Sequence, residues 1–110
     1  MEHEVRVEEN AVVIVLRGDL DLATSRDVRQ VLLNAVAQKK AVVVDLAGVA
    51  YMDSSGVASL VEALQAAKTG DRPLILAAVT PAVLRVLQLA RLDRVFTIEA
   101  SVDAALASQG

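Results

Sequence analysis

The feature that most constrains this fold is a junction in mid-chain, where an apolar run leads into a polar turn and then into a helical pattern. Residues 41–46 are almost entirely apolar, which is typical of a strand at the centre of a sheet. The turn contains Asp53, Ser54, Ser55 and Gly56, and residues 55–68 then repeat apolar side chains at helical spacing. A buried strand followed by an amphipathic helix predicts an α/β fold.

The rest of the chain continues this alternation. Residues 4–8 and 11–16 read as two strands joined by a turn at Glu9–Asn10, so we expect an antiparallel hairpin. Thr24 and Asp27 resemble a capping box, which predicts the start of a helix. We expect this helix to end near residue 38. Thr80 before Pro81 predicts another helix start. The remaining expected elements are strands over residues 74–79 and 95–98 and a helix over residues 101–108.

A hairpin followed by alternating helices and strands requires crossovers between parallel strands. We therefore predict one α/β domain over residues 1–110, with a mixed four- to five-stranded sheet layered with about four helices. A chain of 110 residues is long enough for one core and too short for two ordinary domains.

Charge and composition exclude several classes of partner. The formal net charge is -3 and no cluster of Lys and Arg is present, so we expect no direct binding of nucleic acid. The chain begins with charged residues rather than a signal peptide, contains no cysteine, and has no apolar run near the length of a membrane span. These observations predict a cytoplasmic protein without a membrane association.

Few residues offer catalytic chemistry. His3 is the only imidazole and lies next to the terminus, and the spacing of Asp19, Asp21, Asp45 and Asp53 does not support a metal or acid-base site. The glycines are isolated, without the spacing of a phosphate-binding loop. We therefore expect no enzyme activity and no cofactor, which leaves binding, modification, or both.

Ser54 is the candidate for modification. A helix start exposes unpaired backbone N–H groups and the positive end of the helix dipole, so a serine there is accessible and tolerates a phosphate. Plain N-capping by Ser54 is the ordinary explanation for such a serine. The residues alone leave both roles open.

Four segments together resemble a known family. Gly18-Asp19-Leu20-Asp21, the strand at residues 42–46, Asp53-Ser54-Ser55-Gly56, and Thr80-Pro81-Ala82-Val83 are similar in order and spacing to the STAS domain. The resemblance covers nearly the whole chain and is greatest to the stand-alone bacterial anti-sigma factor antagonists.

This resemblance implies a partner switch that regulates transcription. In the family, the unphosphorylated antagonist binds a kinase-type anti-sigma factor and releases the sigma factor, and phosphorylation of the first serine after the aspartate blocks that binding. By position this serine is Ser54, followed by Ser55 and Gly56, and Asp21 matches an acidic residue of the neighbouring loop. A PP2C-type phosphatase would then act on phosphorylated Ser54.

The expected partner surface extends beyond the motif. Ala58, Ser59 and Glu62 are predicted on the exposed flank of the helix, within two turns of Ser54. Gly56 has two possible roles: its missing side chain lets a partner approach the backbone, or the backbone conformation at this position favours glycine. Tyr51 is expected to pack against the helices. The predicted partner-binding set is Asp21, Asp53, Ser54, Ser55, Gly56, Ala58, Ser59 and Glu62.

Other functions remain as alternatives. The chain could instead be a STAS subunit of an ABC-type lipid-transport complex or of a stress-sensing assembly, although the Ser/Thr site often degenerates in such subunits. A small enzyme would need a base, metal cluster or phosphate loop that the sequence lacks. Self-association of the domain also stays open.

Overall fold

The computed structural model describes residues 1–109, with side chains for residues 1–108. This stretch forms five strands and four helices. In chain order they are β1 (Glu2–Val7), β2 (Ala11–Leu20), α1 (Ser25–Val36), β3 (Ala41–Met52), α2 (Ser54–Thr69), β4 (Leu74–Ala77), α3 (Pro81–Leu89), β5 (Thr97–Glu99) and α4 (Val102–Gln109).

The strands form one mixed sheet in the order β1-β2-β3-β4-β5. β1 is antiparallel to β2, whereas β2, β3, β4 and β5 run parallel to one another. The predicted hairpin, the mixed α/β fold and the central position of β3 are therefore confirmed.

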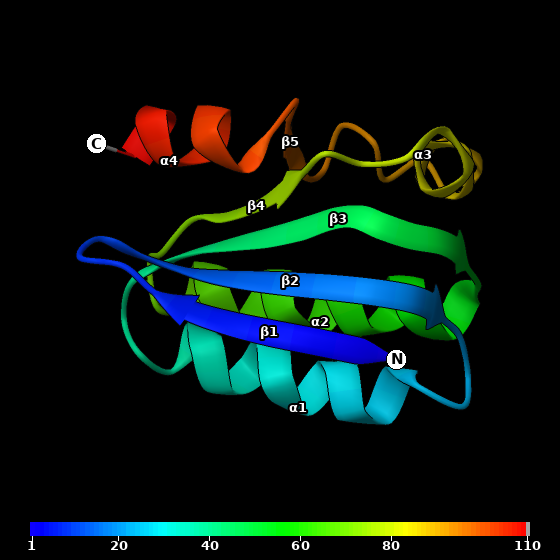
Figure 1. The fold of residues 1–110 in the computed structure, drawn as a ribbon, viewed down its shortest axis with the longest axis horizontal. Helices are drawn as coiled ribbons and strands as arrows, with labels where there is room; N and C mark the ends of the chain where they lie inside the picture. The colour runs from blue at the N-terminus through cyan, green and yellow to red at the C-terminus, as the bar shows by residue number, and fades with distance from the viewer. Residues whose placement is uncertain (110) are drawn as a thin grey trace.

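Helices cover both faces of the sheet. In Figure 1, α1 and α2 lie on one side of the sheet and α4 lies on the other. The larger core lies between the sheet and α1 and α2, and includes Ile14, Leu32 and Leu60. The smaller core forms where Ala105 of α4 packs on side chains such as Val13 and Val43. Because successive residues of a strand point to opposite faces and both faces are covered, residues 11–16 of β2 and nearly all of residues 41–46 of β3 are buried.

Strands β2 and β3 are longer than predicted, and their extra residues determine where the candidate site lies. The predicted ends were Leu16 and Leu46, but the strands run to Leu20 and Met52. Parallel pairing continues through irregularities on either side of Gly18, whose φ of 113° suits glycine. Cross-strand hydrogen bonding therefore overrides the local glycine signals, and Leu20 pairs with Met52 at the last position.

The predicted end of β4 and the predicted start of β5 were also wrong. β4 ends at Ala77 because Ala78 has a φ of 54° and its N–H donates to the carbonyl of Glu99 at 3.0 Å. β5 begins at Thr97 because the N–H groups of Val95 and Phe96 donate to the carbonyl of Leu92 in a turn.

The predicted start of α3 is confirmed. The Thr80 hydroxyl accepts a hydrogen bond from the N–H of Val83 at 3.4 Å, and Pro81 is the first helical residue. The same hydroxyl lies 2.9 Å from the carbonyl oxygen of Val49, to which it donates. One side chain thus caps α3 and joins it to β3.

Candidate functional site

The candidate site lies where β2 and β3 end side by side. Leu20 and Met52 are the last paired residues, and the N–H of Asp53 donates to the carbonyl of Leu20 at 3.2 Å. The loop after β2 and the helix after β3 therefore begin at the same edge of the sheet. This arrangement brings Asp21 and Ser54, 33 positions apart in the sequence, into one surface region.

Asp53 joins the two segments with its two carboxylate oxygens. Its Oδ1 accepts hydrogen bonds from the N–H groups of Ser55 and Gly56, at 2.9 and 3.2 Å, and so caps α2. Its Oδ2 accepts a hydrogen bond from the N–H of Leu22 at 3.2 Å. A negative charge at this position also complements the positive end of the helix dipole.

Ser54 follows this cap and is exposed as the first residue of α2. The expectation that Ser54 caps the helix was wrong, because Asp53 occupies the N-cap position and takes the nearest free N–H groups. Within residues 1–108, no group forms a hydrogen bond with the Ser54 hydroxyl. The Ser54 hydroxyl is therefore accessible and free of hydrogen bonds, whereas the neighbouring Asp53 side chain is held in place by its hydrogen bonds.

The Asp21 carboxylate shapes its own loop. Its Oδ1 accepts hydrogen bonds from the N–H groups of Ala23 and Thr24, at 3.0 and 3.2 Å. The predicted capping box at Thr24 and Asp27 is wrong, since Thr24 makes no side-chain cap. Its hydroxyl instead donates to the carbonyl of Asp19 at 2.8 Å and accepts from the N–H of Asp21 at 3.0 Å. These bonds fix the loop beside Asp53.

Gly56 faces inward rather than toward a partner. It is buried in α2, and a Cβ placed on it would lie 2.6 Å from the Leu20 carbonyl oxygen and 2.9 Å from Cγ of Met52. This packing supports the local structural reading of Gly56, and its contact with a partner stays a prediction. Its missing side chain lets α2 approach the ends of β2 and β3.

The flank of α2 is exposed at Ala58 but not at Ser59. Ser59 is only 4% exposed, and its hydroxyl lies 3.1 Å from the carbonyl oxygens of both Ser25 and Ser55. The predicted exposure of Ser59 is therefore wrong, because α1 covers this position, and its contact with a partner stays an untested prediction. Ser55 is half-buried, and its place in the partner surface stays a prediction.

Glu62 is half-exposed and pairs with Arg29 of α1. One Glu62 oxygen accepts from Nη2 of Arg29 at 3.0 Å, and the other accepts from Nε of the same side chain. The hydrogen bond from Arg29 lowers the pKa of the Glu62 carboxyl below its ordinary value. Glu62 thus links α1 to α2, and its contact with a partner stays a prediction.

One exposed apolar residue beside the site was missed from the sequence, and the exposure of another, which lies near it along the chain, was wrongly predicted. Leu22 is 77% exposed, although its N–H is tied to Asp53. Tyr51 is 52% exposed, so the expectation that it packs against the helices was wrong. The sequence did contain a signal for the exposure of Leu22, because this leucine lies in a predicted turn rather than on the apolar face of a helix or strand.

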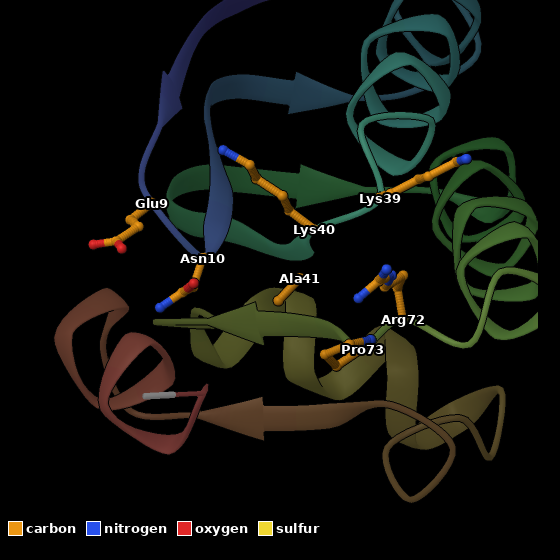
Figure 2. A pocket seen from close by; sticks show the side chains of 7 residues that line it. All are labelled: Glu9, Asn10, Lys39, Lys40, Ala41, Arg72 and Pro73. Carbon is orange, nitrogen blue, oxygen red and sulfur yellow. The ribbon is translucent and has the colours of Figure 1, made fainter.

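A separate cavity of about 520 Å³ lies at the opposite end of the parallel strands. It is lined by Glu9, Asn10, Lys39, Lys40, Ala41, Arg72 and Pro73. Figure 2 shows the side chains of Lys39, Lys40 and Arg72 spread apart rather than converging on one point. Lys40 also donates from Nζ to the carbonyl of Glu8 at 2.9 Å. This cavity shares no residue with the Ser54 region.

In the part of the chain that the structure describes, no group of three or more acidic or histidine side chains is arranged to hold a metal ion. None of the helices in this part has both the length and the apolar character needed to cross a membrane.

Comparison with known proteins identifies both a sequence family and similar structures. The family model of the STAS domain matches residues 2–105. An anti-sigma factor antagonist from Mycobacterium paratuberculosis has a TM-score of 0.88 and 25% identity, with 98% of this chain and 92% of that chain covered. An anti-sigma-factor antagonist (STAS) domain protein from Planctomyces limnophilus has a TM-score of 0.86 and 26% identity, with 97% of each chain covered.

A third similar structure represents a modified state. It is the Bacillus cell fate determinant SpoIIAA in its phosphorylated form, with a TM-score of 0.76 and 23% identity, covering 97% of this chain and 98% of that chain. At this identity the similarity establishes a shared fold.

Proposed function

The chain belongs to the STAS domain family, and from this premise we propose that it is an anti-sigma factor antagonist switched by phosphorylation of Ser54. In its unphosphorylated form it binds a kinase-type anti-sigma factor in the cytoplasm and releases the sigma factor. That anti-sigma factor is the serine kinase that modifies Ser54, and a PP2C-type phosphatase restores the free hydroxyl. The domain acts by binding rather than by catalysis.

The exposed and uncommitted Ser54 hydroxyl is the observation that carries this proposal. Both oxygens of the Asp53 carboxylate, but only Oδ1 of the Asp21 carboxylate, accept hydrogen bonds from backbone N–H groups of their own chain. A partner therefore meets a free hydroxyl beside the loop that carries the exposed side chain of Leu22. This combination supports docking through apolar contact around Ser54.

A phosphate would oppose such docking. It adds a charge of about -1.5 to -2 at neutral pH. Burial of this charge between Leu22 and a partner leaves it without water, and a loss of about 2.7 kcal/mol already weakens binding a hundredfold. The phosphate would also lie next to the Asp53 carboxylate, which repels it. The switch therefore acts by local exclusion of the partner.

Phosphorylation and binding are tested together with a candidate anti-sigma kinase. The protein is incubated with the kinase and ATP, the modified residue is located by mass spectrometry, and binding is measured for wild type, Ser54→Ala and Ser54→Asp. We expect phosphate on Ser54 in wild type, retained binding by Ser54→Ala, and a loss of at least about tenfold for Ser54→Asp.

Ser101→Asp is the matched control. Ser101 also precedes a helix, and its hydroxyl accepts from the N–H of Ala104 at 3.0 Å, but it lies over the opposite face of the sheet beside Asp45. Ser101→Asp adds the same charge at a helix start away from Ser54, and we expect unchanged binding. Tight binding by Ser54→Asp together with an unmodified Ser54 would refute the proposed switch.

A further inference from the structure

Strand β1 has an uncovered edge. Among the described strands β1 pairs with β2 alone, and all six of its residues are exposed. Figure 1 shows β1 along the outer side of β2, at the edge of the sheet. Such an edge carries unpaired N–H and C=O groups and is a template for another strand.

The two faces of β1 differ in chemistry. Val5 and Val7 stand opposite Ile14 and Val12, so they lie on the face covered by α1, yet they are 44% and 59% exposed. A groove of about 180 Å³ runs between β1 and α1 and is lined by His3, Val5, Val31, Asn34, Ala35 and Gln38. Exposed valines beside a groove are unusual for the outer edge of an isolated sheet.

The opposite face of β1 carries opposite charges two residues apart. Glu4 and Arg6 stand opposite Val15 and Val13, so they lie on the face that α4 partly covers. Glu4 also forms an ion pair with Arg17 at 3.7 Å. The edge strand therefore presents a negative and a positive side chain symmetrically about Val5.

We propose that β1 pairs antiparallel with β1 of a second copy of this chain, with Val5 facing Val5. In this register Glu4 of each copy faces Arg6 of the other, and opposite charges across a strand pair stabilise it. On the other face His3 meets Val7 of the second copy, beside the groove along α1. This pairing extends the sheet across a twofold axis and does not depend on the proposed function of Ser54.

Alternative registers are less favourable. Pairing centred on Arg6 sets Arg6 against Arg6 and Glu4 against Glu8, which are like charges. Pairing centred on Glu4 sets Arg6 against Glu2, but it places Glu4 against Glu4 at its centre and Val5 against His3. A shift by a single position sets charged residues of one copy against valines of the other, because successive side chains point to opposite faces. Among these registers, only the Val5-centred one sets no like charges and no charge against a valine within Glu2–Val7.

One feature limits the strength of this association. In the Val5-centred register Glu2 faces Glu8 of the second copy, just beyond the end of β1 at Val7. This like-charge pair opposes association at both ends of the paired strands. Glu8→Lys therefore creates an opposite-charge pair, and we expect it to tighten the dimer.

Sedimentation velocity of the full chain over a range of concentrations tests the pairing. We expect a dimer in wild type, a dissociation constant raised at least about tenfold in Glu4→Arg and in Arg6→Glu, and recovery in the double variant that exchanges the two charges. An equimolar mixture of the two single variants should form a heterodimer. Circular dichroism establishes that each variant is folded.

Two results would overturn the proposal. The first is a wild-type chain that stays monomeric at millimolar concentration. The second is a dimer that Glu4→Arg and Arg6→Glu leave unchanged, since that dimer uses another surface. If a single variant fails to fold, the double variant and Glu8→Lys still decide the matter, because an unaltered dissociation constant in Glu8→Lys contradicts the register.

Discussion

Replacement of Gly56 by alanine probes the contact that places α2 against the ends of β2 and β3. The new Cβ would lie 2.6 Å from the Leu20 carbonyl oxygen, whereas ordinary contact begins at 3.4 Å. Because that oxygen belongs to the backbone of a paired strand, α2 must move away. Overpacking of this kind costs about 1–3 kcal/mol. Alanine gains about 0.5–1 kcal/mol over glycine within a helix, so we expect a net loss of about 1–2 kcal/mol.

Thermal and urea unfolding measure this loss, and Gly70→Ala is the matched control. A Cβ on Gly70 would lie no closer than 3.7 Å to its nearest neighbour, and the φ of Gly70 is -86°. Alanine there restricts the unfolded chain without a clash, so we expect unchanged or slightly raised stability. For Gly56→Ala we expect the melting temperature to fall by roughly 4–8 °C per kcal/mol.

The outcome that refutes this reasoning is a Gly56→Ala variant as stable as Gly70→Ala. In that case α2 is not in close contact with the strand ends, and Gly56 becomes available again as a surface residue. Binding offers a second readout, because movement of α2 also displaces Ser54. We therefore expect Gly56→Ala to weaken anti-sigma binding even at temperatures where the variant remains folded.

Three further predictions concern the cap, the ion pair and the apolar border of the site. Ser54→Ala should change the free energy of unfolding by less than about 0.5 kcal/mol, whereas Asp53→Ala should lose about 1–2 kcal/mol in urea unfolding, and equal losses would contradict the cap assignment. The lowered pKa of Glu62 means that its ionised form stabilises the fold above the ordinary Glu pKa, and that this contribution disappears as the pH falls through the lower folded value. The stability difference between wild type and Glu62→Gln should therefore vanish on acidification, and a difference that persists at strongly acid pH would exclude Arg29 as the cause. Leu22→Ala should weaken anti-sigma binding about tenfold at unchanged stability, as measured by calorimetric titration, and unaltered affinity would remove Leu22 from the interface.

Periodicity was sufficient to predict the order of the elements. Alternation of polar and apolar residues located the hairpin, and the apolar run at residues 41–46 correctly placed β3 at the centre of the sheet. The Thr80–Pro81 start of α3 was also predicted, because cap chemistry depends on neighbouring residues only. Both kinds of signal, the cap residues and the repeated apolar pattern, can be read from neighbouring residues without knowledge of tertiary contacts.

Features that depend on tertiary contacts were predicted less well. The continuation of β2 and β3 past Gly18 and Gly48 arises from pairing between the strands, which local signals do not report. Asp53 and Ser54 are both good cap residues, and only the backbone geometry distinguishes them.

The buried face of α2 was predicted too narrowly. Ser59 and Ala63 are buried because α1 packs against α2 closely at small side chains, in addition to the contact of α2 with the sheet. A single helical stripe of large apolar residues does not reveal this second contact, so Ser59 was placed on the surface. Whether Ser55, Ala58 and Glu62 contact a partner depends on a molecule that the sequence of this chain does not describe.

The hydrogen bonds that Asp53 accepts from two separate segments affect the entropy cost of binding a partner. Because its two oxygens hold the loop at Leu22 and the first turn of α2 at the same time, both halves of the surface are ordered before a partner arrives. A partner then loses little free energy to conformational entropy on docking, which favours a fast and largely rigid association. Under the proposed switch, we therefore expect the difference in affinity between unmodified and phosphorylated protein to report the phosphate itself, rather than a rearrangement of the protein around it.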